Sequence, residues 1–74
     1  MVTWNLERFG RRLRELREQL GKSQEAMADL IGVDRSYYGG IERGTRNPSI
    51  KILFRFCKST GIKPEEVFSG CNND

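Results

Sequence analysis

The stretch Ser23–Arg43 constrains the fold more than any other part of the chain, and it reads SQEAMADLIGVDRSYYGGIER. Met27 and Ile31 are four positions apart before a short turn, and Tyr38 and Ile41 are three positions apart after it. This spacing places each pair on one side of a helix and predicts two short helices. Gly32 stands where the first helix must end in a left-handed residue, and Asp34 can cap the second. Ala28 is small enough for the two helices to cross closely. These are the steric requirements of a helix-turn-helix.

The flanking segments predict three further helices with short connections. From Asn5 to Leu20, apolar residues recur at helical spacing and form one stripe: Leu6, Phe9, Leu13, Leu16 and Leu20. A fourth helix should follow the cap Ser49 and end at Gly61, and a fifth should begin at Pro64. We therefore expect an all-α, compact five-helix bundle with a central helix-turn-helix. It should form a single domain over residues 1–74, with a frayed tail from about residue 69.

Composition limits the classes of function. The chain has 74 residues, a net charge of +3, no histidine and only two cysteines, Cys57 and Cys71. A zinc site needs about four ligands, and no nucleophile–base pair is recognisable, so we expect no metal, no cofactor and no enzymatic activity. A chain this small has little room for a small-molecule pocket. The absence of a membrane-length apolar run and of a signal-peptide pattern favours a cytoplasmic protein with free thiols.

The first turn of the helix predicted at residues 35–43 exposes three side chains suited to DNA: Arg35, Ser36 and Tyr37. A recognition helix reads base edges in the major groove mainly with its N-terminal residues. Arginine can bond guanine O6 and N7 together, and tyrosine can pack on a thymine methyl group or bond a phosphate. We therefore predict that these three residues read bases of double-stranded DNA. The alternative is that Arg35 is an ordinary solvated surface residue.

A second set of polar and basic residues borders the same helix: Ser23, Gln24, Arg43, Arg46, Asn47 and Lys51. Helix N-termini, neutral donors and cations together clamp the phosphate backbone of DNA. A cluster of charges can equally be a solvated face. The position of this set beside the predicted reading helix favours phosphate contact.

Glu42 is an acidic residue on the helix that should approach DNA, and its charge would repel phosphate unless it were neutralised. We predict a salt bridge from Glu42 to Arg17, which would tie the reading helix to the first helix. Gly10 lies inside that first helix, where glycine costs about 1 kcal/mol relative to alanine, so it can mark a close helix contact. The pair Gly39–Gly40 allows two interpretations. Either the backbone approaches DNA there, or one glycine makes room for packing and the other has no role.

These residues resemble the Cro/C1-type (Xre-like) helix-turn-helix domain of bacteria and phages. The matching runs LREQLGKSQEAMA, IGV, IERGTRNPSI and GIKPEEVF span roughly residues 13–68. Within this family, DRSYYGGIERGTRNPSIKILFR is similar to the controller proteins of restriction-modification systems. The chain departs from the family pattern at Tyr38, where a smaller aliphatic residue is usual, and at Gly39, where controller proteins more often have a polar residue.

The resemblance implies a lambda-repressor-like bundle and a sequence-specific transcriptional regulator. It also implies phosphate contact by Gln24, base reading from the turn 35–37, an internal Arg17–Glu42 bridge and a dimer formed by the last helices. A symmetric dimer would match a partly palindromic operator with half-sites about one helical turn apart.

The dimer interface is expected on the last two helices, and the candidates are Ile52, Phe54, Val67 and Phe68. In the fourth helix we expect the inward stripe to consist of Ile50, Leu53, Phe56 and Cys57. Ile52 and Phe54 lie off this stripe and are expected to be exposed. The alternative for Val67 and Phe68 is that they close the core of the monomer. Trp4 can either staple the first helix or reach a second subunit.

Two other functions remain open. An antitoxin or a phage-type repressor would use the same DNA-binding surface, and only the neighbouring genes would distinguish it. A helix-turn-helix module that binds proteins instead of DNA belongs to a different class. It predicts weak DNA association that salt does not affect. The basic residues after the predicted reading helix favour DNA binding.

Overall fold

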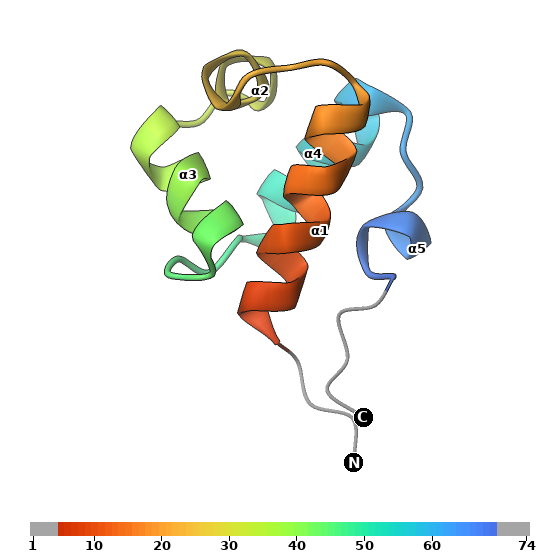
Figure 1. Cartoon of the computed structure of the whole chain (residues 1–74). Helices are drawn as coiled ribbons and strands as arrows, with labels where there is room; N and C mark the ends of the chain where they lie inside the picture. The colour runs from red at the N-terminus through yellow and green to blue at the C-terminus, as the bar shows by residue number, and fades with distance from the viewer. Residues whose placement is uncertain (1–4, 70–74) are drawn as a thin grey trace.

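The computed structural model describes residues 5–69, which fold into five α-helices (Figure 1). The helices are α1 Leu6–Gln19, α2 Gln24–Ile31, α3 Arg35–Arg43, α4 Ile50–Thr60 and α5 Pro64–Val67. The predicted all-α class is confirmed, because the described residues contain helices and turns and no strand. The predictions for Trp4, for Cys71 and for the tail beyond Ser69 lie outside the described residues.

Local signals set the helix boundaries. Four helices begin at a side-chain cap: the side chains of Asn5, Ser23, Asp34 and Ser49 each accept a hydrogen bond from a backbone N–H of the first turn. Such a cap contributes about 1 kcal/mol. Gly32 ends α2 with φ 72°, the left-handed conformation that turns the chain into α3. The predicted end of the first helix at Gly32 and the predicted helix at residues 35–43 are therefore confirmed.

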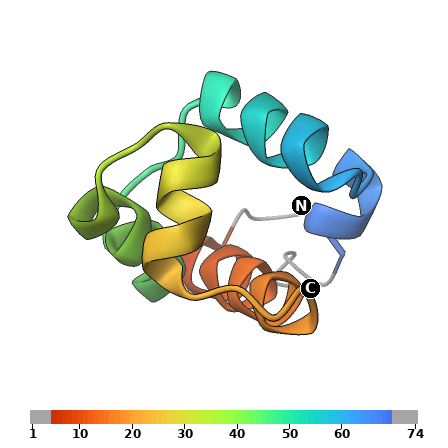
Figure 2. The ribbon, with the colours of Figure 1, turned by 90° about the horizontal axis from the view of Figure 1, so that it is seen from above.

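Helix α1 is the longest helix of the described residues. It packs against α3 and α5, while α2 packs against α3 and α4. Viewed from above, α2 and α3 lie on one side of the molecule and α5 on the other (Figure 2). This packing leaves one side of α3 without a neighbouring helix. Among residues 5–69, every helix is too short or too polar to span a membrane.

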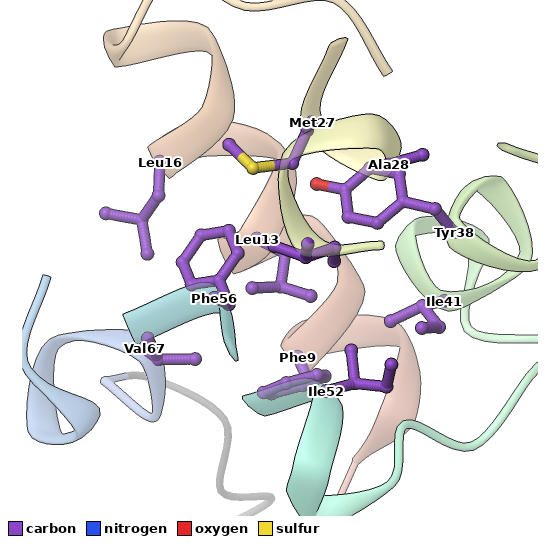
Figure 3. Close-up of a cluster of buried hydrophobic side chains, with 11 residues drawn as sticks. Phe9, Leu13, Leu16, Met27, Ala28, Tyr38, Ile41, Ile52, Phe56 and Val67 are labelled. Carbon is purple, nitrogen blue, oxygen red and sulfur yellow. The ribbon is translucent and has the colours of Figure 1, made fainter. Parts of the chain in front are cut away.

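The core lies where the five helices meet, and every helix contributes to it (Figure 3). Its buried members are Phe9, Leu13, Leu16, Met27, Ala28, Ile31, Tyr38, Ile41, Ile52, Phe56 and Val67. Tyr38, the unusually large residue for its position, is fully buried, and its ring lies beside Ala28. Burial, more than the nearby Glu42 carboxylate, raises the pKa of Tyr38, so the phenol stays protonated. The core fixes α2 and α3 relative to each other, as the helix-turn-helix pattern predicted.

Two residues expected at a dimer surface are buried inside the monomer. Ile52 is only 8% exposed and Val67 only 1%, whereas Ile50, expected to face inward, is exposed. Helix α4 carries apolar residues on two faces, and the face with Ile52 and Phe56 is the one that enters the core. The structure therefore contradicts the prediction that Ile52 is exposed for a partner, and Val67 follows the alternative in which it closes the core of the monomer.

Gly10 lets α1 and α3 touch, as its position predicted. A Cβ atom at Gly10 would overlap the backbone carbonyl oxygens of Ile41 and Glu42. Backbone atoms cannot move aside unless a whole helix shifts, so we expect Gly10→Ala to lower the free energy of unfolding by about 1–3 kcal/mol. Urea unfolding followed by circular dichroism measures this. Ser59→Ala on the exposed side of α4 is the control, with an expected change below about 0.5 kcal/mol. Equal stability of Gly10→Ala and wild type would contradict the predicted contact.

Candidate nucleic-acid interface

The first turn of α3 is exposed and held in a fixed direction. The carboxylate of Asp34 accepts hydrogen bonds from the backbone N–H of Ser36 at 2.9 Å and of Tyr37 at 3.3 Å. Arg35 and Ser36 are both exposed, and the Arg35 side chain makes no ion pair among residues 5–69. The cap therefore presents these two side chains to the solvent from a rigid helix start.

Tyr37 lies differently from its two neighbours. Its ring is partly buried against the core, and its hydroxyl donates a 2.6 Å hydrogen bond to the carbonyl oxygen of Asn47. The residue thus links the first turn of α3 to the loop that precedes α4. The sequence predicts a side chain free to contact DNA, but the structure gives the Tyr37 hydroxyl a partner in the protein.

Gly40 explains how this loop can lie against α3. A Cβ atom at Gly40 would overlap Cγ of Arg46, and the Gly40 carbonyl oxygen accepts hydrogen bonds from the backbone N–H of Thr45 at 2.9 Å and of Arg46 at 3.2 Å. Gly40 is therefore the glycine that makes room for packing. The loop side chains of Arg46 and Asn47 are exposed beside it, followed by exposed Lys51 in the first turn of α4.

Glu42 is the centre of a buried polar network. Its carboxylate accepts hydrogen bonds from Arg17 at 2.7 and 3.1 Å and from the Gln24 amide at 2.9 Å, and its side chain is 1% exposed. The Arg17–Glu42 bridge expected from the resemblance is thus present. Arg17 also donates to the backbone carbonyl of Lys22 at 2.7 Å, just before α2. Helices α1, α2 and α3 are therefore tied together by a single carboxylate.

The network keeps Glu42 ionised. Burial alone would raise the pKa of Glu42, but the hydrogen bonds from Arg17 and Gln24 and the charge of Arg17 outweigh it and hold this pKa below its usual range. The hydrogen bond to Glu42 also raises the pKa of Arg17. The pair carries no net charge, so the acidic residue on α3 is neutralised from within the protein. Arg14 adds a further cation, with its Nε 3.9 Å from a Glu42 oxygen.

Sequence reasoning missed two parts of this arrangement. Arg14 follows Gly10 by four positions on the side of α1 that faces α3, and this spacing was the only signal for it. The bond between Gln24 and Glu42 has no local signal, because the two residues are 18 positions apart. Gln24 therefore has one amide N–H held by Glu42 and one left for another acceptor. Ser23 caps α2 through its oxygen, accepting from the Ala26 N–H at 3.0 Å, and keeps its hydroxyl hydrogen for donation.

A second surface lies on the opposite side of the molecule, between α4 and α5. An entirely apolar groove is lined there by Ile50, Leu53, Phe54, Cys57, Pro64, Val67 and Phe68. Phe54 is 67% exposed, and the partly exposed Phe68 stacks on Phe9 with ring centroids 5.9 Å apart. Of the four interface candidates, the structure thus leaves Phe54 and Phe68 available to a partner. Exposed apolar surface of this kind commonly marks a protein contact.

The model of the Helix-turn-helix family HTH_3 matches residues 13–67, which include α2, α3 and α4. The chain therefore belongs to this Cro/C1-type helix-turn-helix family and is a transcriptional regulator of the helix-turn-helix type. Relatives of known structure point to one group within the family. The restriction-modification controller protein C.AhdI from Aeromonas hydrophila is 51% identical, with a TM-score of 0.81, and the match covers 85% of this chain and 96% of that one.

Two other relatives support the same placement. The control protein C.MunI from Mycoplasma sp is 44% identical over 63 residues, which are 84% of this chain and 85% of that protein. The structure of C.Esp1396I bound to a 25 base pair operator site superposes with a TM-score of 0.75 at 30% identity, covering 89% of this chain and 87% of that chain. The predicted family and the predicted similarity to controller proteins are both confirmed.

Proposed function

We propose that this protein is a restriction-modification controller protein that binds a partly palindromic operator in double-stranded DNA as a homodimer. The observation that carries the proposal is the exposed, capped first turn of α3 with the basic loop of Arg46 and Asn47 beside it. The similarity to controller proteins, one of them solved on an operator, supports it.

Base reading is assigned to Arg35 and Ser36. A guanidinium can bond O6 and N7 of one guanine at once, which discriminates against other bases by about 1–3 kcal/mol. Tyr37 stands beside them and holds the loop through its bond to the Asn47 carbonyl. To reach DNA itself, the Tyr37 hydroxyl would have to exchange that bond for one to the DNA.

Phosphate contact is assigned to groups on both sides of α3. On one side lie Ser23 and Gln24 at the start of α2, where backbone N–H groups and the helix dipole favour an anion. On the other lie Arg46, Asn47 and Lys51, all exposed. Two clamps that flank a reading helix would fix its register on the duplex without adding sequence information themselves.

The homodimer is assigned to the groove between α4 and α5. An isologous contact needs a self-complementary patch, and an all-apolar groove with Phe54 at its edge provides one. A chain of 74 residues also buries only a thin core on its own. Dimerisation would therefore stabilise the fold and would place two copies of α3 for two half-sites.

The test of DNA binding is a selection from random-sequence duplexes long enough to hold two half-sites one helical turn apart. We expect the wild-type protein to enrich a partly palindromic sequence, and its affinity for that selected duplex to fall steeply as salt rises. Equal binding to all duplexes would leave a nonspecific DNA binder. Weak binding that salt does not change would instead favour a protein-interaction module.

Phe54→Glu tests the dimer. A carboxylate placed in the apolar groove would have to be desolvated at the interface, so we expect a monomer at concentrations where the wild type is dimeric. Sedimentation equilibrium measures this, and binding to the selected duplex should weaken in parallel. Ser59→Glu makes the same charge change on another exposed position of α4 and should leave both properties unchanged. An unchanged dimer in Phe54→Glu would rule out the groove as the interface.

A further inference from the structure

Gly39 shares one face of α3 with two exposed arginines. Arg35, Gly39 and Arg43 are four positions apart, a spacing that aligns side chains along a helix. Gly39 itself is buried while both arginines are exposed. The glycine thus lies between the predicted base-reading turn and a cation at the far end of the same helix.

The surroundings of Gly39 differ from those of the other two glycines inside helices. A Cβ atom at Gly39 would lie 3.2 Å from Nη1 of Arg43 and 3.6 Å from Oε1 of Gln24, both ends of flexible side chains. At Gly10 and Gly40, by contrast, a Cβ atom would overlap atoms close to or within the backbone. The φ of Gly39 is not positive, so its conformation does not require glycine. Neither packing nor backbone geometry accounts for this residue, although glycine inside a helix is less favourable than alanine.

We propose that Gly39 is a specificity-determining residue that lets Arg43 read a base. The missing side chain leaves room for the Arg43 guanidinium to lie back over α3, beside the Gln24 amide oxygen, on the face that carries Arg35. Arg43 then belongs to the reading face of the helix and not to the phosphate-contacting loop. This inference rests on the proposed DNA-binding function and adds a second arginine to its reading surface. The expected target is a guanine, whose O6 and N7 match a guanidinium.

The test compares wild type with Gly39→Ala, Arg43→Ala and the double variant on the duplex selected by the wild type and on its single-base variants. The methyl group of alanine would push the Arg43 guanidinium away from α3 by a few tenths of an ångström and would meet only the ends of flexible side chains, so the fold should persist and the melting temperature should not fall. We expect Gly39→Ala to bind the selected duplex about tenfold more weakly, a coupling within the range for contacting residues. Gly39→Ala and Arg43→Ala should lose base preference at the same position in each half-site. The double variant should bind no more weakly than Arg43→Ala alone.

Ser59→Ala serves as the control, because it introduces alanine at an exposed helical position remote from α3 and should leave base preference unchanged. Wild-type affinity and base preference in Gly39→Ala would overturn the inference and leave the proposed function intact. A uniform loss across all duplexes in Arg43→Ala would also overturn it, because Arg43 would then contact phosphate. Failure of the wild type to select any sequence would refute the proposed function, and the inference with it.

Discussion

Arg35→Ala should weaken binding to the selected duplex by about a hundredfold or more. Each half-site would lose one guanidinium–guanine pair, worth about 1–3 kcal/mol, and a dimer loses two. The variant should lose base preference at one position in each half-site and keep it at the others. Its stability should not change, because Arg35 is exposed and its removal leaves the core intact. Fluorescence anisotropy with the selected duplex and its single-base variants measures both the affinity and the preference.

Arg46→Ala provides the contrasting control for Arg35. A phosphate contact carries no sequence information, so this variant should bind selected and unrelated duplexes more weakly by a similar factor. The dependence of affinity on salt should also become shallower, by about one released counterion for each phosphate that the variant no longer neutralises. If Arg35→Ala behaved in this uniform way, the assignment of base reading to the first turn of α3 would be wrong.

Glu42→Gln should lower the free energy of unfolding by about 3–5 kcal/mol, because it leaves the buried Arg17 guanidinium without a counter-charge. The shape of the side chain is kept, so the loss of stability reports the charge and its hydrogen bonds. The matched control is Glu15→Gln, which removes the exposed ion pair between Arg12 and Glu15, 3.4 Å apart, and should cost at most about 1 kcal/mol. Urea unfolding of both variants at neutral pH compares them directly, and equal losses would contradict the structural role of Glu42.

The same residue predicts how stability depends on pH. The pKa of Glu42 is lower in the folded protein than the unfolded value of about 4.3, so its contribution is fully present above that pH. It is lost as the pH falls through the folded-state pKa, where the carboxylate takes up a proton and the bridge to Arg17 fails. Wild type should therefore lose stability below about pH 4 more steeply than Glu42→Gln. Parallel stability curves for the two proteins in acid would contradict this account.

Helices α2 and α3 could be predicted from sequence because their signals are local. Ser23 and Asp34 are caps that act within three residues, and Gly32 ends α2 by its own backbone conformation. The apolar anchors of the motif recur on one face only, so the direction of burial was unambiguous. In α4, apolar side chains occupy two faces, and spacing alone could not say which one enters the core. Because of that ambiguity, Ile50 was expected in the core but is exposed, and Ile52 was expected on the surface but is buried.

The candidate site was predictable in its residue types but not in its side-chain partners. Exposure of Arg35 and Ser36 follows from helical spacing. The bond from Tyr37 to the Asn47 carbonyl and the bond from Gln24 to Glu42 join residues that only the fold brings together. The same holds for Gly39 and Gly40, adjacent in sequence, because one lies beneath Arg43 and the other against Arg46.

The division of α3 into two faces has a consequence for how such a regulator can change its target. Tyr38, Ile41 and Glu42 hold the helix in the protein, while Arg35, Ser36 and Arg43 are exposed and Gly39 lies beneath the end of the Arg43 side chain. A library that varies only positions 35, 36, 39 and 43 would leave the buried anchors of the helix unchanged. Under the proposed function, a lineage of these proteins can therefore acquire a new operator by few substitutions, because the residues assigned to recognition and those that hold the fold are different residues of one short helix.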